Sequence, residues 1–117
     1  MRGMKKIEHY SFGNITVDGE SYTSDVIIYP DRVDSSWWRK EGHNLRVDDL
    51  KDIVKAQPNI LVIGTGAYGV MRVPKETVAH LESKGIKVYA MKTGEAVDLF
   101  DKLPKDNLII AALHLTC

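Results

Sequence analysis

The first third of the chain has the hydrophobic pattern of short β-strands. Residues 7–12 alternate between apolar and polar positions, and Asp18-Gly19 separates two further β-prone runs. Asp-Gly between such runs predicts a tight hairpin, because both central residues of a type I′ turn need positive φ. Val26-Ile27-Ile28-Tyr29 predicts another strand, which ends at Pro30. We therefore expect an N-terminal antiparallel β-hairpin region, followed by a loop around a short strand at 31–44.

From residue 48 onward, helical and strand patterns alternate. Apolar positions at helical spacing predict helices, and continuous apolar runs predict strands buried on both faces. The helices are expected to begin near Asp48, at Pro74 and after a cap at Thr93, and the strands to cover 59–63, 87–91 and 108–115. Short helices between apolar strands indicate a layered α/β domain. The 117 residues leave room for one domain, 1–117, and the N-terminal strands make the whole sheet system mixed.

Composition narrows the classes of function. The chain has 16 Lys+Arg and 16 Asp+Glu residues, so its formal net charge is zero. Nucleic-acid-binding proteins normally carry a basic excess and anionic membranes attract basic surfaces, so we expect neither partner. No uncharged stretch has the composition of a membrane helix, and the first residues lack the apolar run of a signal peptide. The single cysteine excludes an intrachain disulfide, and these features together predict a cytoplasmic protein.

The sharpest motif is Gly64-Thr65-Gly66-Ala67-Tyr68-Gly69, a G-x-G-x-x-G sequence that follows an apolar strand. In dinucleotide-binding folds such glycines bring the backbone close to a pyrophosphate at a helix N-terminus. The context argues against that site, because Pro74 prevents a helix from running through the motif and no acidic residue ends the next strand. Two interpretations stay open. The segment is a tight glycine loop, or its backbone N–H groups and the Thr65 hydroxyl bind a small anion.

A second segment is expected at the same edge of the sheet. Lys92 and Thr93 follow the next strand, and ligands of open α/β sheets bind beyond the carboxyl ends of parallel strands. Lys92 could supply a positive charge there, although it also fits a solvated surface lysine. The candidate ligand-binding residues are Gly64, Thr65, Gly66, Lys92 and Thr93.

Trp37-Trp38-Arg39 is the candidate partner-binding segment. Adjacent residues of an extended chain point to opposite sides, so one tryptophan can pack inward while the other faces a partner. Trp and Arg are enriched at the energetic centres of protein interfaces. The alternative is one tryptophan in the core and one that covers the loop.

His114 and Cys117 have the residue types of a metal or nucleophile pair, but not the spacing. In a strand, positions three apart lie about 10 Å apart on opposite faces. The other histidines show no metal-ligand spacing either, so we assign no metal site. Cys117 is a candidate reactive thiol, yet no base lies beside it in the sequence. We therefore assign no catalytic residue and no cofactor.

One series of residues extends over most of the chain. It comprises Gly42-His43-Asn44-Leu45, Asp49-Leu50, Pro58, Ile63-Gly64-Thr65-Gly66, Gly85-Ile86, Met91-Lys92-Thr93, Ala96, Leu103 and Ala111-Ala112-Leu113-His114. The series resembles the Mth938-like family of small α/β domains, which includes the mitochondrial respiratory complex I assembly factor three and an adipogenesis-associated protein. The resemblance implies a three-layer domain whose mixed central sheet has one strand running against the others. If the reversed strand is 108–115, Cys117 lies at the opposite end of the sheet from Thr65 and Thr93.

The resemblance implies no catalytic residue or cofactor, and its assembly-factor member suggests protein–protein work. Our leading hypothesis is a non-enzymatic protein-binding or assembly module with an unknown protein partner. The alternative is an enzyme or sensor that binds a small anionic metabolite or nucleotide at the Gly-Thr-Gly loop. A monomer and a homodimer both remain open, although symmetric dimers are the commonest oligomers.

Overall fold

A computed structural model describes residues 5–104 and 107–117. Its strands are β1 (Ile7–Ser11), β2 (Asn14–Val17), β3 (Glu20–Tyr22), β4 (Val26–Ile28), β5 (Val33–Asp34), β6 (Ile60–Thr65), β7 (Lys87–Met91) and β8 (Ile109–His114). Its helical segments are the 3₁₀ turn η1 (Val47–Leu50) and the α-helices α1 (Lys51–Ala56), α2 (Lys75–Ser83) and α3 (Thr93–Lys102). Among the described residues, no helix is long and apolar enough to cross a membrane.

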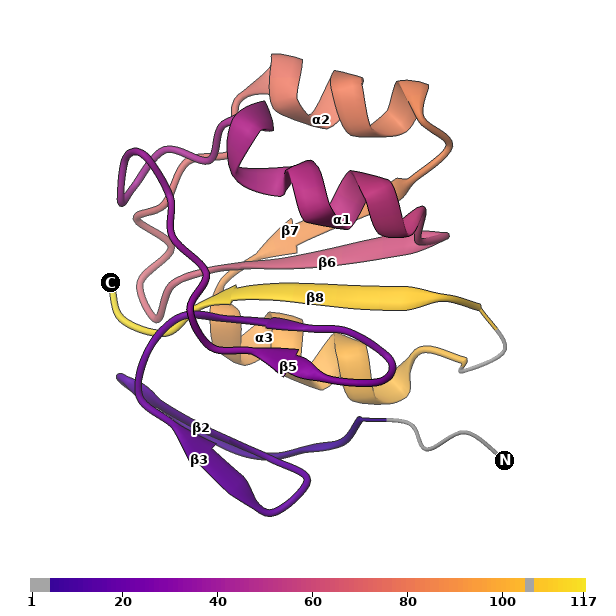
Figure 1. Ribbon diagram of the computed structural model, residues 1–117. Coiled ribbons are helices and arrows are strands. Elements are labelled where there is room, and N and C mark those ends of the chain that lie inside the picture. The colour runs from indigo at the N-terminus through magenta and orange to yellow at the C-terminus, as the bar shows by residue number, and fades with distance from the viewer. Residues whose placement is uncertain (1–4, 105–106) are drawn as a thin grey trace.

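The elements form three layers, of which the central one is a mixed five-stranded sheet of order β5-β4-β8-β6-β7. Strands β8, β6 and β7 are parallel, whereas β4 pairs antiparallel with both β8 and β5. Helices α1 and α2 cover one face of this sheet, and α3 covers the other together with the antiparallel sheet β1-β2-β3 (Figure 1). The predicted three-layer α/β fold, with its mixed central sheet and N-terminal antiparallel region, is confirmed.

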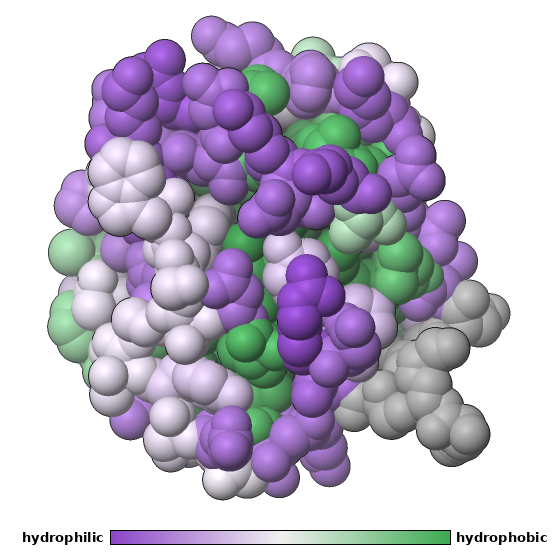
Figure 2. Space-filling model, in the orientation of Figure 1, coloured by the Kyte–Doolittle hydropathy of each residue, from purple (hydrophilic) through white to green (hydrophobic). Residues whose placement is uncertain are grey.

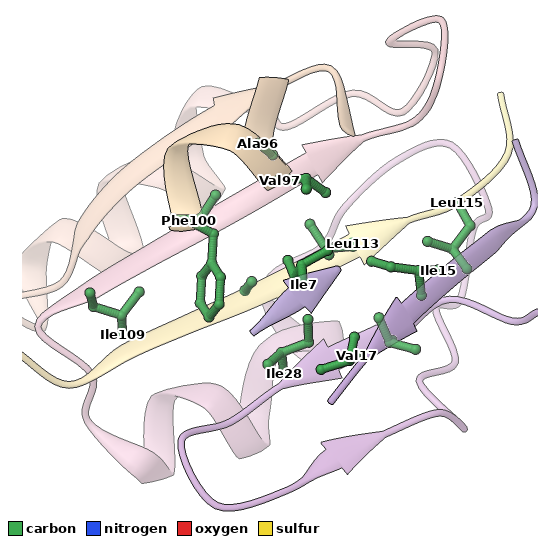
Figure 3. Packing of buried hydrophobic residues seen from close by; sticks show 13 residues of the cluster. Ile7, Ile15, Val17, Ile28, Ala96, Val97, Phe100, Ile109, Leu113 and Leu115 are labelled. Atoms are coloured by element: carbon green, nitrogen blue, oxygen red, sulfur yellow. The ribbon is translucent and has the colours of Figure 1, made fainter. Parts of the chain in front are cut away.

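The two faces of the central sheet carry separate apolar cores. Every residue of β8 is buried, which agrees with its uninterrupted apolar sequence. On the α3 side, Phe100 reaches from the helix to the sheet, while Ile7, Ile15 and Val17 project into the same core from the N-terminal strands (Figure 3). Burying such side chains contributes about 1.5–3 kcal/mol each, so the N-terminal strands are an integral layer of the fold.

The Asp18-Gly19 hairpin is confirmed by positive φ angles of 50° and 83°. Two expected helix starts differ from the structure by one residue. Pro74 is the N-cap of α2 and Thr93 is already helical, with Lys92 at its N-cap. The Thr93 side chain does not cap its helix, because its hydroxyl bonds to β8 and to the loop after β6 instead.

The direction of β8 decides where Cys117 lies. The reversed strand of the sheet is β4, and β8 runs parallel to β6 with Thr65 opposite His114. The chain after β8 therefore leaves the sheet at the same edge as the Gly64–Gly69 loop and Thr93. Because β8 is not the reversed strand, Cys117 does not lie at the opposite end of the sheet from Thr65 and Thr93.

Candidate functional site

The carboxyl ends of β6, β7 and β8 come together around the Thr93 hydroxyl. Its Oγ1 accepts the Gly66 N–H at 2.8 Å and donates to the His114 carbonyl at 2.6 Å. The Thr65 hydroxyl donates to the Met91 carbonyl at 3.0 Å. Thr93 is fully buried, so its hydroxyl does not face a ligand. Its two hydrogen bonds connect the start of α3, which follows β7, to the ends of β6 and β8.

Gly66 is a glycine because the C-terminal segment passes directly over it. Its φ is +107°, and an added Cβ would lie 2.3 Å from the Cys117 carbonyl oxygen and 2.9 Å from His114 Cδ2. Gly64 is equally restricted, because its Cβ would lie 2.7 Å from Thr93 Oγ1. Close approach of two backbones is a common reason for glycine. Residues 115–117 pack directly against this glycine loop.

Five backbone donors of this loop are already occupied, including the Gly66 N–H described above. Ala67 N–H donates to the Thr116 carbonyl at 2.6 Å and Val70 N–H to the Cys117 carbonyl at 2.9 Å. Gly69 N–H bonds to Gly66 and Met71 N–H to Thr65, both within the loop itself. The exposed Lys92 side chain packs beside Gly69, with its Cγ 3.3 Å from where a Cβ would stand. An anion bound by these N–H groups would have to replace bonds that hold the C-terminal segment.

Beneath that segment lies a buried ion cluster of Asp25, Arg39 and His114. Arg39 Nη2 contacts Asp25 Oδ2 at 2.8 Å, and His114 Nδ1 contacts the same oxygen at 2.8 Å. The other carboxylate oxygen accepts the Leu115 N–H at 2.8 Å. The Arg39, His114 and Asp25 side chains are 5%, 6% and 18% exposed, so water has little access to the cluster. It connects the residue before β4, the Trp37–Lys40 segment and the end of β8.

The carboxylate is held in its charged form by these partners. Burial acts to raise the Asp25 pKa, but hydrogen bonds from His114, the Leu115 N–H and Arg39 outweigh it and lower the pKa to about 2. Arg39 also bonds through Nε and Nη2 to the Gly42 carbonyl. Two buried nitrogens, Arg39 Nη1 and His114 Nε2, have no partner among the described residues.

His43 and Cys117 lie at the outer side of this cluster. The His43 ring stands edge-on to the His114 ring, with 5.6 Å between centroids and 67° between planes. Cys117 Sγ is 3.9 Å from His43 Nε2, which is the reach of a weak thiol–imidazole hydrogen bond. Cys117 is half-buried and His43 is exposed. His43, which is 74 positions away in the chain, is thus the imidazole that lies next to the Cys117 thiol.

The Trp37-Trp38-Arg39 segment divides between the interior and the surface. Trp37 is half-buried, donates its Nε1–H to the Asp49 carbonyl at 3.1 Å and lies 4.7 Å under the Arg39 guanidinium. Trp38 is 75% exposed. The predicted opposite orientation of the two tryptophans is thus present, whereas Arg39 belongs to the buried ion cluster and not to the surface that Trp38 presents.

Trp38 borders a groove of about 340 Å³. The groove is lined by Ile27, Asp34, Ser36, Trp37, Trp38, Lys40, Asp48, Asp49, Lys51 and Asp52. Four aspartates and two lysines leave two negative charges in excess. Both Asp49 oxygens accept backbone N–H groups, from Lys40 at 3.0 Å and from Arg46 at 2.9 Å. Within the described part of the chain, Asp48 and Asp52 form no ion pair.

A second apolar surface lies near the C-terminal segment. Phe12 and Tyr68 are 57% and 70% exposed, and their rings are 5.9 Å apart. Val70, two positions after Tyr68, is also exposed. Figure 2 shows strongly polar side chains over α1 and α2, whereas the side on which the C terminus lies is made mostly of weakly polar residues.

In residues 5–104 and 107–117, no group of three or more His, Cys, Asp or Glu side chains could hold a metal ion.

The sequence and the fold agree with a known family. A family model described as "Protein of unknown function (DUF498/DUF598)" matches residues 7–114. This chain belongs to the DUF498/DUF598 family. The Mth938-like resemblance is confirmed by the fold of a Mth938-like domain from Bordetella pertussis, which is 20% identical with a TM-score of 0.75 over 95% of this chain and 85% of that one.

Two other solved structures are similar over almost their whole length. A conserved hypothetical protein from Pyrococcus horikoshii OT3 is 28% identical, with a TM-score of 0.82 over 96% of this chain and 99% of that chain. A Bartonella henselae protein described as an outer membrane protein is 26% identical, with a TM-score of 0.81 over 99% and 98% of the two chains. The DUF498/DUF598 family is one of unknown function, so membership establishes the fold and leaves the activity open.

In this DUF498/DUF598 protein the sequence motifs correctly predict which edge of the sheet carries the candidate site. They do not predict all the side chains that meet there. Gly64, Thr65, Gly66, Lys92 and Thr93 do lie together, as expected. Asp25 and His43 are absent from the candidate residues, because each stands alone in an irregular segment. The one available signal is the polar His114 in an otherwise apolar strand, since a buried polar group requires a partner.

Proposed function

We propose that this protein is a non-enzymatic protein-binding or assembly module, and that the groove beside Trp38 binds a basic segment of its partner. The observation that carries the proposal is Trp38 itself. A tryptophan that is 75% exposed contributes much less to the stability of the fold than a buried core residue does. Trp38 is nevertheless carried by a segment that is held in place by the residues packed beneath it. Tryptophan is the side chain most enriched at the energetic centres of interfaces.

The rigidity comes from Trp37 and the ion cluster. Trp37 is fixed by its bond to the Asp49 carbonyl and by the Arg39 guanidinium that lies over its ring. Arg39 is in turn held by Asp25. Trp38 is therefore presented by a segment that needs little ordering when a partner binds, and lower ordering cost favours affinity.

The charges of the groove favour a basic partner. The carboxylates of Asp48 and Asp52 are available there, and the lining has two negative charges in excess. An arginine or lysine over the exposed indole would gain a cation–π interaction of about 0.5–2 kcal/mol while its charge faces the aspartates. We further propose a cytoplasmic location, since a reducing compartment would keep the single thiol free.

A selection of displayed random peptides on the wild-type protein tests the proposal. We expect enriched peptides to carry arginine or lysine, and a synthesised one to lose about tenfold or more in affinity for Trp38→Ala. Phe12→Ala is the matched control, because it removes another exposed aromatic ring outside the groove. Equal affinity for wild type and Trp38→Ala, or a selection without basic peptides, would refute the assignment.

A further inference from the structure

We propose that Cys117 is a reactive thiol, that His43 takes its proton, and that the pair exchanges with a low-molecular-weight disulfide. This site lies at the C-terminal segment and shares no residue with the lining of the Trp38 groove. Its activity is therefore independent of the proposed function, and either can fail without the other.

Backbone hydrogen bonds hold the main chains of the two reacting residues in place. The carbonyl of His43 accepts the Arg72 N–H at 2.8 Å, and the carbonyl of Cys117 accepts the Val70 N–H at 2.9 Å. Both bonds lead to residues of the segment that follows β6. The fold thus brings the two residues together, with Sγ and Nε2 3.9 Å apart, and catalytic contacts often start long and shorten when a substrate binds.

A second observation marks this place as a binding site. The His114 ring uses Nδ1 for the ion cluster, while its Cδ2 edge faces Gly66 and the Cys117 carbonyl. The nitrogen on that edge, Nε2, is buried and has no partner among the described residues, and the side chain is 6% exposed. A buried polar atom without a partner destabilises the structure that contains it. A polar group of a bound molecule beside the thiol would remove that destabilisation.

The surroundings suit a small molecule with an apolar portion. The His114 ring supports the His43 ring edge-on, so the base has a defined orientation. The exposed Tyr68 and Val70 belong to the loop that bonds to Thr116 and Cys117. They provide apolar surface for the carbon chains next to a disulfide.

The reaction balances without a further oxidant. The Cys117 thiol gives its proton to His43 Nε2, and the thiolate attacks one sulfur of the disulfide RS–SR. A Cys117–S–S–R bond forms, the RS–SR bond breaks, and the leaving thiolate RS⁻ accepts the proton from His43. Cys117 is oxidised to a mixed disulfide while one RS group is reduced to RSH. The rate depends on the thiolate fraction, which a neighbouring base increases.

The test uses reduced protein and oxidised glutathione at neutral pH, followed by intact mass spectrometry. Cys117 is the only cysteine, so every adduct reports on this site. We expect one glutathionyl group per chain, formed faster in the native protein than in the same chain unfolded in urea. His43→Asn should slow the reaction by about tenfold or more, since a positioned base typically contributes at least 10²-fold.

His9→Asn is the matched control, because His9 is exposed on β1 away from the thiol, and it should leave the rate unchanged. Cys117→Ser should abolish the adduct. Thermal melting of each variant shows whether it is folded, and His43→Gln replaces His43→Asn if the latter is not. A wild-type rate in the folded His43 variant would overturn the proposal. So would a native rate no higher than that of the unfolded chain.

Discussion

Replacing Asp25 by asparagine tests whether the buried ion cluster stabilises the fold. The change keeps the shape of the side chain and removes the charge that pairs with Arg39 at 2.8 Å. The fall of the Asp25 pKa from 3.8 to about 2 corresponds to roughly 2 kcal/mol of stability, at about 1.4 kcal/mol per pKa unit. A second estimate of the same loss comes from broken buried ion pairs, which cost about 3–5 kcal/mol because the remaining charge, here that of Arg39, stays buried and unpaired. We expect Asp25→Asn to lower the free energy of unfolding by about 2–4 kcal/mol at neutral pH.

The pH dependence gives the same prediction a distinctive form. A carboxyl whose pKa is lowered by folding stabilises the protein fully above about 3.8 and loses that effect as the pH falls through about 2. Protonated aspartic acid has nearly the shape and charge of asparagine. The difference in stability between wild type and Asp25→Asn should therefore shrink as the pH falls through this window.

Urea denaturation at several pH values measures both quantities. Asp31→Asn is the control, because Asp31 forms a surface ion pair with Arg32 and its side chain is 73% exposed. Such pairs contribute about 0–1 kcal/mol. Equal losses for the two variants, or a difference between wild type and Asp25→Asn that stays constant from neutral pH to about pH 2, would refute the reasoning.

The other predictions concern the glycine loop and its hydroxyl. Gly66→Ala should lower the free energy of unfolding by about 3 kcal/mol or more, because φ is +107° and the Cβ would overlap the Cys117 carbonyl. Its control Gly94→Ala, which has open space around it in α3, should leave the free energy of unfolding unchanged or raise it by up to about 1 kcal/mol. Thr93→Val should cost about 2 kcal/mol, since the buried Gly66 N–H and His114 carbonyl lose their partner, whereas Thr16→Val on the exposed face of the hairpin should cost under about 0.5 kcal/mol. Denaturation curves that do not separate each variant from its control would contradict these assignments.

Local sequence determined most of the fold. The continuous apolar run of Ile60–Ile63 and the alternation before Asp18-Gly19 specify strands, because burial on one or two faces imposes the pattern directly. The one-residue shifts at Pro74 and Thr93 have a physical reason as well. A side chain at a helix start can bond either to its own helix or to neighbouring elements. The Thr93 hydroxyl bonds to the loop after β6 and to the end of β8, so it does not cap its own helix.

Tertiary structure alone decided the site. The direction of β8 depends on which strands pair, and it places Cys117 over Gly66 instead of at the far end of the sheet. The partnership of Asp25 with Arg39 and His114 joins residues as many as 89 positions apart, and that of His43 with Cys117 joins residues 74 apart. Such contacts leave no periodic trace in the sequence, because each needs only one residue at one position. The G-x-G-x-x-G motif shows the difference: the sequence states where glycine is required, and only the packed C-terminal segment explains why.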